Sequence, residues 1–212
     1  MTLSGLLVDF GGVLTTDVFR SFREFSEREG LDPGHVKDKL RTEPRVRALL
    51  RRLEKGEVDT GEFEPEFAQA IGVDDADGLV ERLFRGIGPD ERMLGAVRAC
   101  RAAGVRTGLI SNSWGDGVAY DPALLEELFD AVVISGEVGL HKPQPEIFEL
   151  GAERAGVPAA QCVFVDDLRE NCEGAEAVGM TAVLHRGADG TLPRLEELLG
   201  VSLADSAGRG ST

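Results

Sequence analysis

The sequence has few cysteines and no long hydrophobic run. Its 212 residues include three cysteines, an odd number without a Cys-x-x-Cys pair. This count argues against a disulfide framework and against a structural zinc site. No apolar stretch approaches the roughly 18 residues that span a bilayer, and Asp9 ends the first apolar run. We therefore expect no signal peptide, no membrane segment and a cytoplasmic location.

Positive charge is also scarce. The chain has 23 Lys and Arg residues against 38 Asp and Glu residues, for a formal net charge of −15. Such a surface repels phosphate backbones and anionic headgroups, so we expect neither nucleic-acid nor membrane binding. The composition, 42% hydrophobic and 29% charged, is that of a folded globular protein, either a monomer or a homodimer.

Short apolar runs alternate with helical segments in most of the chain. The predicted strands are residues 3–8, 105–110, 131–134, 162–165 and 181–184. The predicted helices after Pro89 are residues 90–102, 122–129, 145–155, 170–178 and about 192–199. This alternation predicts βαβ units with right-handed crossovers and a parallel sheet.

Residues 17–88 have a different pattern. They are rich in charge, and apolar residues such as Phe19, Phe22 and Phe25 recur at helical spacing. We expect four or five helices here and no strand. The predicted fold is therefore an α/β, Rossmann-like parallel-sheet core (1–16 and 89–203) with a helical cap (17–88) inserted after the first strand. A flexible tail is predicted at 204–212.

Polar residues follow four of the predicted strands, with Ser135 after the third. Asp9 ends the first strand, Ser111 and Asn112 end the second, and Asp166 and Asp167 end the fourth. Ligands of open α/β sheets bind outside the carboxyl ends of the strands. Two adjacent carboxylates after a buried strand repel each other unless a cation is near, and Mg²⁺ prefers oxygen ligands. Taken one at a time, these residues are also compatible with ordinary turns or with helix caps.

Lys142 lies just before a predicted helix, in a loop that Pro143 and Pro145 stiffen. A stiff loop can direct a lysine into a site, although a lone lysine is more often a solvated surface charge. Together with a divalent cation, Lys142 would balance the three aspartates. The set would then be nearly neutral before an anionic substrate arrives.

In this order the motifs resemble those of the haloacid dehalogenase (HAD) superfamily, in the C1-type subfamily IA with an inserted helical cap. They are also similar to the N-terminal phosphatase domain of soluble epoxide hydrolases. The matching segments are Val8-Asp9-Phe10-Gly11-Gly12-Val13-Leu14, Leu109-Ile110-Ser111-Asn112, Lys142 in Gly139-Leu-His-Lys-Pro, and Phe164-Val165-Asp166-Asp167 continued by Asn171.

The resemblance implies a Mg²⁺-dependent phosphatase that acts on a small phosphomonoester. Asp9 would attack phosphorus and carry an aspartyl-phosphate. The implied Mg²⁺ ligands are Asp9, the Gly11 carbonyl and Asp167, with Asp166 as a further ligand or water-binder. Ser111 and Asn112 would hold the phosphoryl group, Lys142 would balance its charge, and Asn171 would orient the aspartate loop.

The sequence departs from this pattern at Gly11, where phosphatases of the superfamily carry a second aspartate. That aspartate is the general acid and base, a role worth about 10²–10⁴ in rate. Asp17, His141 or a cap residue could replace it. Alternatively, the substrate has a good leaving group, as acyl and enol phosphates do, or the protein is a catalytically weak binding module.

The dehalogenase branch of the superfamily also lacks the second aspartate, because halide leaves without a proton. Those enzymes are metal-free and lack the paired carboxylates, so Asp166 and Asp167 favour phosphoryl chemistry. Trp114 and Tyr120 either line the pocket or pack under the cap. Four arginines of the cap lie at helix-compatible spacings, which indicates a solvated helical face rather than substrate contact; they are Arg41, Arg45, Arg51 and Arg52.

Overall fold

The computed structural model describes residues 3–117 and 120–203 and contains one five-stranded parallel sheet. Its strands are β1 (Gly5–Val8), β2 (Arg106–Ser111), β3 (Ala131–Ile134), β4 (Cys162–Asp166) and β5 (Thr181–Leu184), in the order β3-β2-β1-β4-β5. Every neighbouring pair is parallel, as the alternating pattern predicted. The predicted tail lies outside the described residues.

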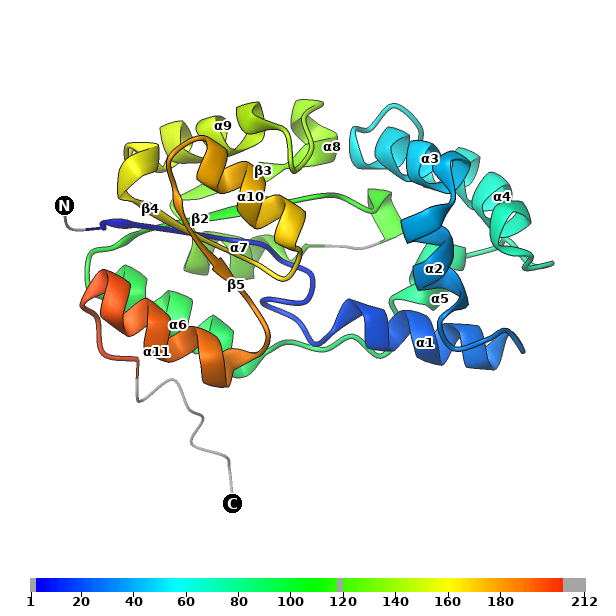
Figure 1. The fold of residues 1–212 in the computed structure, drawn as a ribbon, viewed down its shortest axis with the longest axis horizontal. Coiled ribbons are helices and arrows are strands. Elements are labelled where there is room, and N and C mark those ends of the chain that lie inside the picture. Colours follow the sequence, from blue (N-terminus) through cyan, green and yellow to red (C-terminus); the bar gives the residue numbers. More distant parts are fainter. Residues whose placement is uncertain (1–2, 118–119, 204–212) are drawn as a thin grey trace, which may run out of the picture.

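Helices cover both faces of the sheet (Figure 1). One face carries α6 (Glu91–Ala102), α7 (Pro122–Leu128) and α11 (Ala188–Leu199), and the other carries α9 (Pro145–Ala155) and α10 (Arg169–Ala177). The short α8 (Ser135–Val138) follows β3, and 3-10 turns occupy Gly115–Gly117 and Ala159–Gln161. The fold is therefore the predicted layered α/β core.

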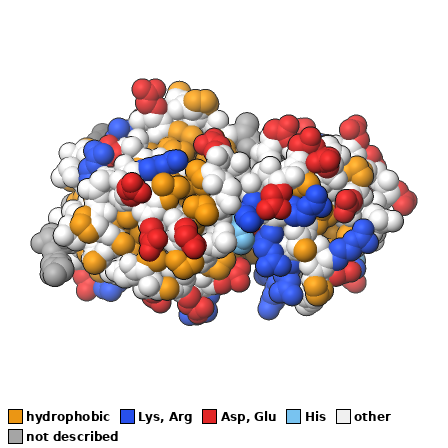
Figure 2. All heavy atoms as spheres, turned by 90° about the horizontal axis from the view of Figure 1, so that it is seen from above, with side chains coloured by type: hydrophobic (Ala, Val, Ile, Leu, Met, Phe, Trp, Pro, Cys, Tyr) orange, Lys and Arg blue, Asp and Glu red, His pale blue; other side chains and the backbone are white. Residues whose placement is uncertain are grey.

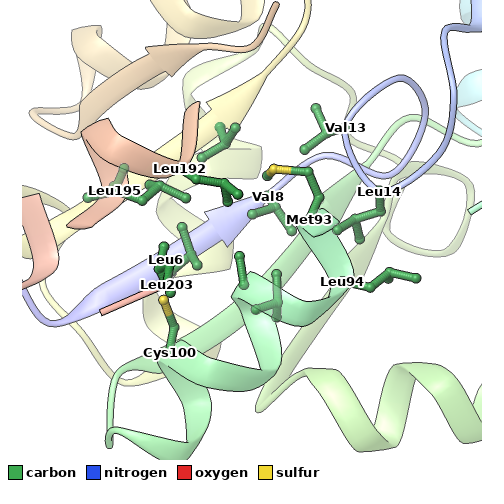
Figure 3. Close-up of a cluster of buried hydrophobic side chains, with 14 of the residues drawn as sticks. Leu6, Val8, Val13, Leu14, Met93, Leu94, Cys100, Leu192, Leu195 and Leu203 are labelled. Atoms are coloured by element: carbon green, nitrogen blue, oxygen red, sulfur yellow. The ribbon is translucent and has the colours of Figure 1, made fainter. Parts of the chain in front are cut away.

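The central strand β1 is buried on both faces. Leu6 and Val8 join an apolar cluster with α6 and α11, in which Met93 and Leu195 are fully buried (Figure 3). Leu7 points to the opposite face and packs in the cluster formed with α9 and α10. Because successive side chains of a strand alternate between faces, burial on both faces requires the continuous apolar run seen here.

Five helices form the inserted segment, namely α1 (Val18–Arg28), α2 (His35–Thr42), α3 (Pro44–Glu54), α4 (Thr60–Ile71) and α5 (Leu79–Leu83). Asp17 and Asp59 begin α1 and α4, because their carboxylates accept backbone N–H groups that have no partner within the helix. The helices enclose their own apolar cluster, which includes Phe25 and Phe63. We call this segment the cap; it lies beside the carboxyl ends of the strands (Figure 1).

The last helix differs from its prediction. It begins at Ala188 rather than near Leu192, after Gly187 with its φ of 117°. Pro193 lies inside it and removes one backbone hydrogen bond. Burial of Ala188, Leu192 and Leu195 against the sheet offsets that loss, and the sequence pattern could not reveal this burial. Among the described residues, no helix combines the length and apolar character needed to cross a membrane.

Candidate active site

Three aspartates meet at the carboxyl ends of the adjacent strands β1 and β4. One ligand atom from each of Asp9, Asp166 and Asp167 lies within 4.8 Å of the others. The strand register brings them together, because the Asp9 N–H continues the β1–β4 ladder and donates to the Val165 carbonyl at 2.9 Å. The sequence thus predicted this grouping correctly.

Lys142 supplies a buried positive charge beside these carboxylates. Its side chain is 1% exposed, and Nζ lies 2.7 Å from Asp9 Oδ1 and 2.7 Å from Asp166 Oδ2. Burial alone would lower the pKa of Lys142, but the charges of Asp166 and Asp9 outweigh burial and raise it. Lys142 is therefore an ammonium ion that bridges two carboxylates.

Asp166 is fully buried and well supplied with donors. Its Oδ1 accepts the Leu168 N–H at 2.8 Å, and Asn171 Nδ2 lies 3.0 Å from both carboxylate oxygens. These bonds fix the carboxylate that holds Lys142. Asn171 therefore acts on the site through Asp166, as a residue that positions its neighbour.

Lys142 offsets the negative charge of Asp9 and Asp167 only in part. Burial raises the pKa of Asp9, and the charges of Asp166 and Asp167 raise it further against the lowering by Lys142. Burial and then Asp166 raise the pKa of Asp167 to about 6. A Cβ on Gly12, whose φ is 76°, would lie 2.7 Å from Asp167 Oδ2, so glycine leaves room for that carboxylate. Uncompensated oxygen donors in this cradle fit a hard divalent cation.

Ser111 and Asn112 follow β2 beside this cluster. The Ser111 and Tyr120 hydroxyl oxygens are 2.9 Å apart, which places Tyr120 next to the site. Asn112 Oδ1 accepts the Lys142 N–H at 2.8 Å, and Asn112 Nδ2 donates to the Lys142 carbonyl at 3.2 Å. The Asn112 side chain thus holds the lysine loop.

Several other residues that the sequence suggested for the site make different contacts. Asp17 caps α1, and His141 Nδ1 lies 2.8 Å from the carbonyl oxygen of Lys142 in its own loop. Trp114 packs under the cap, within 5.1–6.4 Å of four phenylalanine rings between centroids. Lys and Arg side chains gather on the cap next to its boundary with the core (Figure 2). The four cap arginines singled out above are exposed.

The structure adds Glu54, a residue that sequence reasoning did not single out. Glu54 is the last residue of α3, and its Oε1 lies 3.4 Å from Asn112 Nδ2 across the boundary between cap and core. Burial raises the pKa of Glu54 to about 8. Nothing in the sequence separates this glutamate from the other charged residues of its helix; only the docking of the cap brings it to the site.

Comparison with known proteins identifies relatives in the superfamily that the sequence motifs resemble. Residues 3–179 match the family described as haloacid dehalogenase-like hydrolase. Bifunctional epoxide hydrolase 2 of Rattus norvegicus is 28% identical over 120 residues, which are 54% of this chain and 22% of that protein. Sesquiterpene phosphatase astK of Aspergillus oryzae is 28% identical over 159 residues, 70% of this chain and 78% of that protein. The chain spans only 15% to 22% of the length of several longer curated relatives.

The fold is also similar to that of a solved HAD family enzyme from Bacteroides thetaiotaomicron, crystallised with magnesium and inorganic phosphate. The TM-score is 0.64 at 23% sequence identity, with 85% of this chain and 93% of that chain covered. At this identity the likeness concerns the fold alone.

Proposed function

Because the chain belongs to the haloacid dehalogenase-like hydrolase family, we propose that it is a Mg²⁺-dependent phosphatase acting on a small phosphorylated metabolite. The observation that carries the proposal is the cluster of Asp9, Asp166 and Asp167 around buried Lys142. One ammonium ion leaves two negative charges uncompensated, and a divalent cation would balance them.

Asp9 is the proposed nucleophile. One of its carboxylate oxygens forms a bond to phosphorus while the bond from phosphorus to the leaving oxygen of the ester breaks, and the other carboxylate oxygen remains with Lys142 Nζ. The resulting aspartyl-phosphate is then hydrolysed by water. Lys142 thus holds the nucleophile in place and offsets charge that develops during transfer.

The proposed Mg²⁺ ligands are Asp9, the Gly11 carbonyl and Asp167, with Asp166 as a further ligand or water-binder. The cation would supply charge neutralisation for the anionic substrate. Asp167 is the least committed carboxylate, whereas Asp166 already accepts bonds from Lys142 and Asn171. This difference supports Asp167 as the more available ligand.

Ser111 and Asn112 are the proposed holders of the transferring phosphoryl group. They follow the strand next to β1, and Tyr120 supports the Ser111 hydroxyl. Burial raises the pKa of Tyr120 to about 12, so its phenol stays protonated and able to donate at neutral pH. Asn112 also ties the phosphate site to the Lys142 loop.

Two other functions compete because Gly11 lacks the second carboxylate. A 2-haloacid dehalogenase would release halide in the presence of EDTA, whereas the proposed phosphatase would lose activity. A catalytically weak binding module would bind phosphate or beryllofluoride without turnover. The deciding experiment is a phosphate-release screen over a metabolite panel with Mg²⁺, repeated in EDTA. Absence of metal-dependent phosphate release across the panel would overturn the proposal.

A further inference from the structure

We propose that Glu54 of the cap is the general acid and base that replaces the aspartate missing at Gly11. The inference rests on the proposed phosphatase function, because it assigns one step within phosphoryl transfer.

The core holds the Glu54 backbone in place. Ser135 Oγ donates to the Glu54 carbonyl and accepts the Ser113 N–H at 2.8 Å. Two residues further along, a Cβ on Gly56 would lie 2.6 Å from the Gly136 carbonyl oxygen, so the two backbones touch. These contacts fix Glu54 relative to the ends of β2 and β3.

The side chain of Glu54 extends from this anchor toward the proposed phosphate site. Its Oε1 is 3.4 Å from Asn112 Nδ2, and Asn112 directly follows Ser111. Asn112 is itself fixed by its two bonds to the Lys142 backbone. The carboxyl group therefore lies on the cap side of the residues that would hold the phosphoryl group.

Phosphoryl transfer needs an acid on this side of the site. The attacking and leaving oxygens lie roughly in line across phosphorus. Asp9 approaches from the sheet, so the leaving oxygen departs on the opposite side, toward the cap. Gly11 offers no side chain, and the Asp17 carboxylate caps α1. Glu54 is a buried carboxyl group of the cap that lies beside Asn112, on the side of the site where the leaving oxygen would depart.

The surroundings of Glu54 favour its protonated form at neutral pH. Burial raises its pKa to about 8, against lowering by the Asn112 hydrogen bond and the Lys142 charge. Glu170 on α10 also raises this pKa, and Arg51 on α3 lowers it. A carboxylic acid whose pKa lies near neutral pH can both donate and accept a proton.

The proton balance is complete with these groups. Asp9 attacks, the bond from phosphorus to the leaving oxygen breaks, and that oxygen takes its electron pair and the Glu54 proton. The Glu54 carboxylate then accepts a proton from the water that attacks the aspartyl-phosphate. Phosphate leaves, Asp9 regains its carboxylate, and Glu54 is again protonated.

Two esters of similar shape test this step, phenyl phosphate and p-nitrophenyl phosphate. Phenolate needs a proton to leave, whereas p-nitrophenolate does not. Glu54→Gln should lower kcat/KM for phenyl phosphate by about 10²-fold or more, and for p-nitrophenyl phosphate by less than about tenfold. The decline of kcat/KM for phenyl phosphate above about pH 8 should disappear as well.

Glu57→Gln is the matched control, since it removes an exposed glutamate from the loop after the same helix. It should leave both kcat/KM values unchanged, and thermal unfolding should show that both variants are folded. Equal losses for the two esters in Glu54→Gln, or no loss, would overturn the assignment of Glu54. Failure of the proposed function looks different: wild-type protein with Mg²⁺ would release phosphate from neither ester, and the role of Glu54 would fall with it.

Discussion

Replacing Asp167 with asparagine should stabilise the metal-free protein and abolish its response to Mg²⁺. The pKa of Asp167 rises from 3.8 to about 6, first through burial and then through repulsion by Asp166. Each pKa unit corresponds to 1.36 kcal/mol, so the ionised carboxylate costs at most about 3 kcal/mol in the folded state. Solvent reaches part of this side chain, so about 1–2 kcal/mol is expected.

The difference in stability between Asp167→Asn and the wild type depends on pH. Between about pH 4 and pH 6 the folded protein binds more protons at Asp167 than the unfolded chain does, so wild-type stability falls as pH rises through this window. Above it, the asparagine variant should be more stable by the full amount. Below about pH 3, where the carboxyl group is protonated in both states, the difference should vanish.

Urea denaturation in EDTA at pH 8 and at pH 3 measures both effects. Asp74→Asn is the control, because it removes the same charge from an exposed position in the cap. Mg²⁺ at 100 times its dissociation constant should then stabilise the wild type by about 2.7 kcal/mol and leave Asp167→Asn nearly unaffected. A metal-free variant less stable than wild type at pH 8, or undiminished Mg²⁺ binding by calorimetry, would refute this reasoning.

Asp9→Asn should abolish phosphate release while the fold survives, since the amide is nearly isosteric but forms no stable acyl phosphate; retention of more than a few per cent of activity would exclude Asp9 as nucleophile. Gly11→Asp should raise kcat/KM for phenyl phosphate more in a Glu54→Gln background than in wild type, by up to about 10²-fold; this glycine lies outside the left-handed region and tolerates a side chain better than its neighbour does. Trp114→Ala should lower the free energy of unfolding by about 3 kcal/mol in urea denaturation, because the partly buried ring packs among cap phenylalanines. Gly56→Ala should lower the thermal midpoint and weaken activity, because its φ is +69° and a Cβ would collide with a core carbonyl.

The fold was largely predictable because its signals are local. The apolar runs at β3 and β5 matched their predicted bounds, since each is short, continuous and flanked by turn residues. The predicted start of α11 was about four residues too late, and packing on the sheet explains the extra turn. The short α8 carried no sequence signal.

The candidate site was also predictable from the sequence only in part. Asp9, Asp166 and Asp167 could be placed together from sequence, because parallel strands end at one edge and that edge collects the residues that follow them. The position of Lys142 at that edge followed from its motif. Its bond to Asp166, and the use of Asn112 to hold its loop, depend on side-chain geometry that spacing does not encode.

The sequence by itself determined which carboxylates share the strand edge and that a helical segment interrupts the core. Hydrophobic periodicity depends on residues a few positions apart, and strand order depends on a single sheet. Both can therefore be predicted from the sequence pattern. Only the tertiary structure decided that Glu54 faces Asn112, and that Trp114 belongs to the cap's apolar cluster. Both contacts join the cap to the core across 30 or more residues of sequence. Their formation depends on how two separately packed surfaces fit.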